Sequence, residues 1–405
     1  MFRRLIFIPL LILLASPVLA AETDEAVPAE ANGGLAPGLK SDGAQTDVIT
    51  LLKSGDIQRI TQALNLGLDV NLTDGPDGLT PLMLAAAANP DPQVVTLLLA
   101  RGARLEEREN KFGLTPLMFA AGTNSPSVLE ALIAAGAEVN QRDKQGGTAL
   151  YHAAINNRRS PEVIAILIEA GADPELADDE GRTPLRQAVA SGNAWAMELL
   201  IAKGARPNSP DRQGRTPLIE AAGRSEALDI MIRLITLGAD PKAGAQDGTT
   251  PYLAAAATNS RVEALEELKK AGADTKAVDQ SGADALLLAA LSNPNPGVIK
   301  YLLGQGGDLN ARRPNGLTPL LAAAGNQKAE VARTLILAGA EVDTKDKNGR
   351  SSLLLATWLN PNEEVAKVIF KGGADPAEKD PRGQSALDLA RESRPALAEF
   401  FSHER

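Results

Sequence analysis

The apolar residues of this chain recur as pairs of short runs, and each run has the spacing of one helix face. Clear examples of the second run in a pair are residues 94–99 and 163–168, where apolar positions fall at i, i+1, i+4 and i+5. Such positions lie on one side of an α-helix. A run of leucine and small alanines precedes each of them, as at residues 82–87. The pattern predicts helix pairs whose first helix packs closely on its neighbours.

A threonine-led motif marks the start of each first helix. The threonine hydroxyl can cap the helix, the next residue is usually a proline that needs no N–H there, and leucine then turns inward. Nine copies recur at intervals of 33 to 35 residues, and a weaker tenth begins at Ser385. The nine begin at Thr80, Thr115, Thr148, Thr183, Thr216, Thr250, Asp284, Thr318 and Ser351. This regularity predicts an array of equivalent helix–turn–helix units.

A second motif, Gly-Ala followed by a charged residue, recurs in step with the first. Its glycine can close the second helix in a left-handed conformation, and a polar stretch such as 143–146 then leads to the next threonine. The glycines are Gly102, Gly136, Gly171, Gly204, Gly238, Gly272, Gly339 and Gly373, with a Gly-Gly-Asp variant at Gly306. One such unit cannot bury its own apolar face, so successive units must stack.

These two motifs resemble the ankyrin repeat over residues 46–404. The resemblance implies an all-α solenoid of stacked helix–turn–helix repeats, with hairpin-like fingers that project from one edge. It also implies that a partner protein binds the fingers and the concave face lined by the first helices.

The sequence departs from the ankyrin pattern at two places. The histidine that usually follows Thr-Pro-Leu is missing, and residues such as Met83, Tyr151 and Arg186 stand there, which puts its buried hydrogen bond in doubt. Asparagine–proline segments such as 89–92 and 293–296 replace the short turn between the helices. We interpret them as structural, with helix caps before a first-turn proline, and a ligand-binding loop is the alternative.

The chain divides into a signal peptide (1–20), a flexible acidic linker (21–45) and an ankyrin-repeat domain (46–405). Within the domain we expect an N-terminal capping repeat at 46–78, nine repeats at 79–383 and a C-terminal cap at 384–405. The cap is expected to hold a last helix, Leu387–Arg391, and a tail with Phe400 and Phe401. Terminal repeats of a solenoid are atypical because each seals one end of the core.

The first twenty residues have the three parts of a secretory signal peptide. Arg3 and Arg4 precede an apolar run at 5–14. The small residues at 18 and 20 then form the small-x-small pattern that precedes a cleavage site, here before Ala21. An uncleaved anchor is disfavoured because the run is shorter than the roughly 20 residues that a span needs. We therefore expect Sec-type export to the bacterial periplasm, or secretion, without stable membrane insertion after cleavage.

Composition narrows the class of partner. The absence of cysteine excludes disulfides, thiolate nucleophiles and cysteine zinc sites. Cleavage would remove two arginines and no acidic residue, which takes the formal net charge from −10 to −12. A chain this acidic disfavours nucleic acid and anionic lipid as main partners.

The sequence offers little material for catalysis. Its only histidines are His152, interpreted as a packed or solvent-facing helix residue, and His403, the third residue from the end. No metalloprotease, phosphate-binding, dinucleotide-binding or serine-hydrolase motif occurs. We therefore expect a non-enzymatic protein without cofactor or metal.

Five residues are candidates for contact with a partner. Arg182 and Arg215 stand directly before the threonine in adjacent repeats, and we expect them about 8–10 Å apart, the spacing of packed helices. Arg186 and Arg212 are close to them in the sequence. The alternative is that these arginines pair with the chain's own carboxylates, at Asp178, Asp179, Glu180 and Glu220. Trp358, near the end of the ninth first helix, is a candidate aromatic anchor, and its alternative role is to cap the core.

The sequence thus predicts a monomeric scaffold that binds another protein of unknown identity. Two narrower roles stay open: an inhibitor or immunity protein that neutralises a toxic periplasmic enzyme, and an accessory factor for a redox enzyme.

Export can be tested directly. N-terminal sequencing of the protein purified from its native cells should begin near Ala21, because signal peptidase cleaves after the small residue at position 20. A cytoplasmic protein that still carries Met1 would contradict the export hypothesis.

Overall fold

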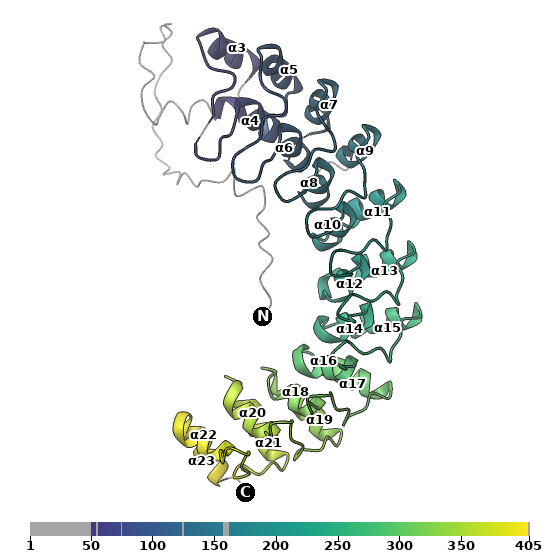
Figure 1. Ribbon diagram of the computed structural model, residues 1–405, viewed down its shortest axis with the longest axis vertical. Helices are drawn as coiled ribbons and strands as arrows, with labels where there is room; N and C mark the ends of the chain where they lie inside the picture. Colours follow the sequence, from purple (N-terminus) through teal and green to yellow (C-terminus); the bar gives the residue numbers. More distant parts are fainter. Residues whose placement is uncertain (1–49, 54–55, 74, 124, 157–161, 404–405) are drawn as a thin grey trace, which may run out of the picture. The chain divides into compact units, whose positions relative to one another are not determined.

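The computed structural model describes residues 50–53, 56–73, 75–123, 125–156 and 162–403. The predicted signal peptide 1–20 and linker 21–45 lie outside these residues. The chain forms two compact units, residues 1–205 (unit 1) and 206–405 (unit 2). Every regular element within the described residues is a helix, and within each unit first and second helices form separate rows (Figure 1). The predicted all-α solenoid is therefore confirmed.

Unit 1 contains four described first helices, preceded by a short helical segment at 50–53. The first helices are α4 (Pro81–Ala88), α6 (Pro116–Thr123), α8 (Ala149–Asn156) and α10 (Pro184–Ala190). The second helices are α3 (Ile57–Asn65), α5 (Pro92–Ala100), α7 (Pro126–Ala134), α9 (Glu162–Glu169) and α11 (Ala194–Ala202). Within unit 1, neighbouring first helices pack on one another, and each first helix packs on its own second helix.

Unit 2 continues the same alternation up to residue 403. Its first helices are α12 (Pro217–Ala222), α14 (Pro251–Thr258), α16 (Ala285–Ser292), α18 (Pro319–Ala323), α20 (Ser352–Leu359) and α22 (Ala386–Ser393). Its second helices are α13 (Leu228–Thr236), α15 (Val262–Lys270), α17 (Pro296–Gly304), α19 (Ala329–Leu337), α21 (Glu363–Lys371) and α23 (Pro395–His403), with the 3₁₀ turn η1 (Ser225–Ala227) before α13.

The helices begin and end where the two sequence motifs predict. At α10 the Thr183 hydroxyl accepts a hydrogen bond from Arg186 N at 3.3 Å, and Pro184 occupies the first turn. Second helices close at glycines in the left-handed region, such as Gly171 with φ 94°. Among the proline-led second helices, Asp91 and Asn295 cap α5 and α17 with their side chains. At α7, Ser125 is the N-cap residue before Pro126, although its side chain makes no cap hydrogen bond, and Ser160 lies outside the described residues.

Buried asparagines between the two helices of a repeat form a hydrogen-bonded ladder through unit 2. Asn293 Nδ2 donates to Ala256 O at 2.9 Å and to Asn259 O at 2.8 Å, both in the preceding repeat. Its Oδ1 accepts from Asn295 N at 2.9 Å, which shapes the turn into α17. Each amide therefore satisfies carbonyls that the preceding first helix and turn leave unpaired. The same arrangement recurs at Asn259, Asn326 and Asn360.

The ladder explains the asparagine–proline segments. Asn89 donates to Leu52 O in unit 1, and Arg394 donates to Asn360 O at 2.7 Å and so closes the ladder of unit 2. Asn89, Asn293 and Asn360 are buried. The structural interpretation of these segments is thus confirmed, because their asparagine amides face the interior of the stack.

The C-terminal end of unit 2 differs from the expected short helix and tail. Residues 395–403 form the helix α23, which packs on α21 and α22. The ring of Phe401 is buried and lies 5.1 Å from that of Phe370, centroid to centroid. The last two helices therefore form a complete pair that covers the apolar flank of the preceding repeat.

Replacement of one ladder residue should destabilise unit 2. Asn293→Ala removes two donors and one acceptor from a buried position, and leaves their partners unsatisfied. We expect the free energy of unfolding to fall by about 2–4 kcal/mol. Urea denaturation measures this change, and Asn348→Ala, at an exposed finger position, should change it by less than about 0.5 kcal/mol. Equal effects of the two substitutions would show that the ladder contributes nothing.

Candidate functional site

In six of the fingers between repeats, a buried or half-buried aspartate organises the turn. In the finger that contains Asp178, its Oδ1 accepts from Glu180 N at 3.1 Å and from Arg182 N at 2.8 Å. A left-handed glycine, Gly181 with φ 81°, completes the turn. The same bonds to the backbone two and four residues later occur at Asp143, Asp211, Asp279, Asp346 and Asp380. Exposed side chains on these fingers are therefore presented in defined positions.

Backbone hydrogen bonds join neighbouring fingers within each unit. In unit 1, Asp179 N donates to Gln145 O at 2.8 Å, and in unit 2, Gln280 N donates to Asp247 O at 2.9 Å. The residues that occupy the donor position in two later fingers are Pro314 and Pro381, which have no N–H. At Pro314 side chains supply the link instead, because Arg313 binds Asp279 at 3.2 Å and also the hydroxyl of Ser281.

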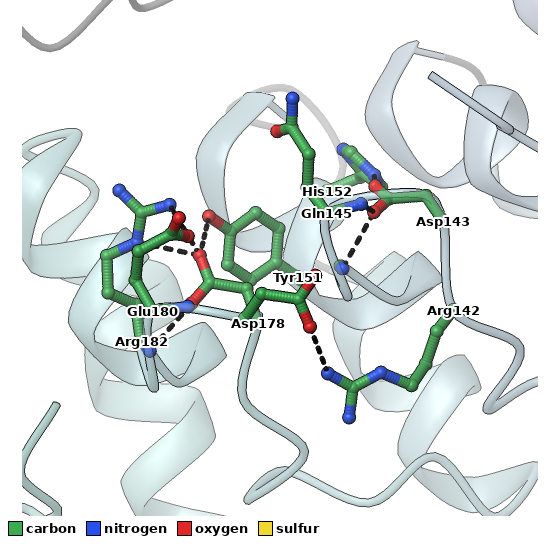
Figure 2. Close-up of polar contacts among 10 residues, drawn as sticks. Arg142, Asp143, Gln145, Tyr151, His152, Asp178, Glu180 and Arg182 are labelled. Atoms are coloured by element: carbon green, nitrogen blue, oxygen red, sulfur yellow. Dashed lines mark hydrogen bonds and ion pairs between the residues drawn. The ribbon is translucent and has the colours of Figure 1, made fainter. Parts of the chain in front are cut away.

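Arg182 lies in a network of polar side chains at the base of its finger (Figure 2). Its Nε donates to Asp178 Oδ2 at 2.7 Å, and its NH2 donates to Glu180 Oε2 at 2.8 Å. The hydroxyl of Tyr151, from α8, donates to the same Asp178 oxygen at 2.7 Å. Burial and the negative charge of Asp178 raise the pKa of Tyr151, which keeps this hydroxyl protonated as a donor. Tyr151, at the position where the family usually has histidine, thus makes a buried hydrogen bond.

The other three candidate arginines have different surroundings. Arg186, in α10, is only 8% exposed and offers little surface to a partner. Arg212 and Arg215 belong to one finger of unit 2, where Arg212 is exposed and Arg215 NH2 lies 3.6 Å from Asp247 Oδ2. Arg182 and Arg186 belong to unit 1. The spacing between Arg182 and Arg215 spans the two units and stays a prediction.

Two tryptophans are exposed. Trp358, near the end of α20, is 52% exposed, and its ring centroid lies 5.6 Å from the guanidinium carbon of Arg350. Trp195, in the first turn of α11, is 44% exposed. The buried ring at the C-terminal end is that of Phe401, so the capping role considered for Trp358 falls to another residue. The sequence analysis did not single out Trp195, because its helix position carries no periodic signal of its own.

An aspartate–histidine pair lies beside the Arg182 network and also escaped the sequence analysis. His152 Nε2 is 2.8 Å from Asp143 Oδ2, and both side chains are largely buried (Figure 2). Burial raises the pKa of Asp143, but bonds from His152 and from the N–H groups of Gln145 and Gly147 outweigh burial and lower it. The available signal was positional: Asp143 lies five residues before Thr148, and His152 lies four residues after it.

The described residues hold no group of three or more histidine, aspartate and glutamate side chains arranged to bind a metal ion. Among the same residues, no helix is both long enough and apolar enough to cross a bilayer.

The family profile described as "Ankyrin repeats (3 copies)" matches residues 49–143, 123–211, 150–244, 188–279, 218–312 and 286–380. The chain belongs to the ankyrin-repeat family. Ankyrin-repeat proteins are typically non-enzymatic scaffolds whose stacked repeats form extended surfaces for binding other proteins.

The chain matches only a small part of the length of its curated relatives. Human SH3 and multiple ankyrin repeat domains protein 2 is 34% identical over 99 residues, which cover 24% of this chain and 5% of that protein. Human SH3 and multiple ankyrin repeat domains protein 1 is 31% identical over 101 residues, 25% of this chain and 5% of that protein. Among solved structures, the human ASB11 ankyrin repeat domain aligns with a TM-score of 0.48 and 24% identity, over 55% of this chain and 97% of that one.

The Asp143 carboxylate should make stability depend on acid pH. Its folded pKa lies below the ordinary value of 3.8, so its contribution is present above that value and is lost as the pH falls through the folded pKa. We expect Asp143→Asn to lower the free energy of unfolding by about 1–2 kcal/mol at pH 7. This difference from the wild type should become smaller as the pH falls below about 4. Urea titrations at pH 7, 5 and 3 measure this change.

A control for the Asp143 experiment is Glu130→Gln, on the exposed side of α7. It should change the free energy of unfolding little at any pH. A constant difference between Asp143→Asn and the wild type across the three pH values would contradict the proposed linkage.

Proposed function

We propose that this ankyrin-repeat protein is an exported, non-enzymatic scaffold that binds a partner protein through its fingers and the exposed face of its first helices. The observation that carries the proposal is the presentation of arginine side chains on fingers whose turns are fixed by carboxylates. Arg182 and Arg215 each hold an ion pair at a finger base, with Asp178 and Asp247 respectively. A partner that binds a pre-positioned guanidinium loses less side-chain entropy on binding.

Arginine is suited to this role because its planar fork can bind a carboxylate through two parallel hydrogen bonds. The Arg182 guanidinium uses Nε and NH2 for Asp178 and Glu180, and its side chain is 19% exposed. Arg212 extends from the same finger as Arg215 and is exposed. Arg186 is buried, so we propose that it supports α10 beneath this surface. Trp358 adds an exposed aromatic side chain of the kind that anchors protein interfaces.

The proposed location follows from the sequence. Residues 1–20 have the order of a Sec-type signal peptide, and export would place the scaffold in the periplasm or outside the cell. An exported ankyrin array without cysteine cannot be stabilised by disulfides, and a stack of this length can bury enough apolar surface to fold without them.

The finger hypothesis is tested by a pair of double variants. Arg182→Lys with Arg215→Lys keeps both charges but removes the fork geometry. We expect capture of the partner from a periplasmic extract, followed by mass spectrometry, to fall roughly tenfold. The melting temperature should stay within about 2–4 °C, since lysine still neutralises Asp178 and Asp247.

The second double variant, Arg182→Ala with Arg215→Ala, should abolish capture and also lower the melting temperature, because Asp178 loses its cation. The matched control is Arg261→Lys with Arg333→Lys, and it should leave capture unchanged. Arg261 directly precedes α15 and Arg333 lies in α19, both second helices. If the Arg182→Lys, Arg215→Lys protein captures its partner as well as the wild type does, these arginines serve only the fold.

A further inference from the structure

The finger tips at the C-terminal end of unit 2 have a charge opposite to that of the whole chain. The tips at 312–316, 345–349 and 379–383, here called the C-terminal fingers, contain six cations and two acids. The two preceding tips of unit 2, at 244–248 and 278–282, contain two acids and no cation. Since the chain carries a net charge of −10, this concentration of positive charge is a local feature.

Both acids of the C-terminal fingers are occupied within their own turns. Asp346 accepts from two backbone N–H groups and also binds Arg350 through Nε at 2.8 Å. Asp380 Oδ1 accepts from Arg382 N and Gln384 N. Four of the six cations, Arg312, Lys347, Lys379 and Arg382, are exposed. The other two are paired within the chain, Arg313 with Asp279 at 3.2 Å and Lys345 with Glu378 at 2.6 Å. A ligand therefore meets a surface of predominantly positive charge.

The C-terminal fingers are in register. Arg312, Lys345 and Lys379 occupy the same position in successive fingers, and the bond from Lys347 N to Asn315 O, at 3.1 Å, joins the first two. Neighbouring repeats place equivalent residues about 8–10 Å apart. This spacing suits carboxylates distributed along an extended or helical segment rather than a single small anion.

An exposed apolar strip lies on the first helices of the same repeats. Leu291 near the end of α16 and Trp358 with Leu359 at the end of α20 are all exposed. Between them α18 is followed by the small residues Ala324 and Gly325, and α18 packs on both neighbouring first helices. Gly325 occupies the position equivalent to Leu291 and Trp358, so the two exposed apolar side chains flank a residue that has no side chain.

Arg350 connects the strip to the C-terminal fingers. It stands at the base of the middle finger, is bonded to Asp346, and its guanidinium carbon lies 5.6 Å from the Trp358 ring centroid. The aromatic ring and the finger base therefore belong to one continuous surface, cationic at the finger side and apolar along the helices.

We propose that the C-terminal fingers and this apolar strip together bind an acidic amphipathic segment of a partner protein. The inference rests on the proposed scaffold function and names the chemistry of its partner. Carboxylates of the segment pair with the exposed Arg312, Lys347 and Arg382, and an apolar side chain inserts between Leu291 and Trp358. A nucleic acid is disfavoured because the net charge of −10 repels it and because it would leave the leucines uncovered.

The test uses the full chain with Trp195→Phe, which leaves Trp358 as the single tryptophan. The probe is a synthetic 18-residue helical peptide, a length of about 27 Å, with glutamate on one face and leucine on the other. Matched probes are the same peptide with lysine for each glutamate, and a single-stranded DNA 20-mer, chosen to have about the same charge density. We expect the glutamate peptide alone to shift the Trp358 emission to shorter wavelength, with an affinity that weakens as salt increases.

Variants assign the binding to this surface. The triple variant Arg312→Gln, Lys347→Gln and Arg382→Gln should bind the glutamate peptide at least tenfold more weakly than the wild type, and this binding should depend less on salt. Trp358→Ala should lower the affinity for the glutamate peptide roughly 30-fold, as expected for an aromatic anchor. The fluorescence anisotropy of a labelled peptide measures this affinity. The matched control, Arg261→Gln with Lys300→Gln and Arg333→Gln, removes three exposed cations near or on second helices and should change nothing.

Three results would overturn the proposal: equal binding of the glutamate and lysine peptides, tighter binding of the DNA, or an unchanged affinity in the finger variant. Partner capture separates this inference from the scaffold function. If the finger variant captures the native partner as well as the wild type does, the scaffold function stands and this surface is not its binding site.

Discussion

The structure depends on one constraint: a single helix pair cannot bury its own apolar face, so each repeat is stable only against a neighbour. The first helices meet through alanines, whose small side chains bring the backbones close together. That closeness also brings carbonyl groups of one repeat within reach of side chains of the next. Four buried asparagines donate side-chain hydrogen bonds to such carbonyls of the preceding repeat: Asn259, Asn293, Asn326 and Asn360. Apolar stacking and the polar ladder therefore reinforce each other at every interface within unit 2.

The fingers follow from the same stacking. In most fingers a carboxylate and a left-handed glycine shape the turn locally, and a backbone hydrogen bond to the preceding finger aligns it. Where proline replaces the donor at Pro314, the Arg313 side chain supplies the contact with the preceding finger. A row of rigid fingers at fixed spacing is a surface on which side chains can vary without cost to the fold.

The distribution of charge distinguishes parts of that surface. Several arginines of this acidic chain are held by carboxylates that also shape the finger turns. Arg182 is fixed by Asp178, and Arg350 is fixed by Asp346 and lies beside Trp358. Such arginines are pre-positioned for recognition, while the exposed Lys347 and Arg382 are available for long-range attraction of an acidic partner.

The sequence by itself determined the repeats, their helix starts at Thr183 and its equivalents, and their ends at left-handed glycines such as Gly171. These features depend on interactions within about four residues, which a linear pattern records directly. Only the tertiary structure decided that Asn293 bonds carbonyls 34 and 37 residues earlier, that Tyr151 and Arg182 share Asp178, and that residues 395–403 form a helix against α21. It likewise decided that Trp358 is exposed while Arg186 is buried, although both stand in similar first helices. Burial and pairing across repeats depend on which atoms the stack brings together, and the period of the sequence does not contain that information.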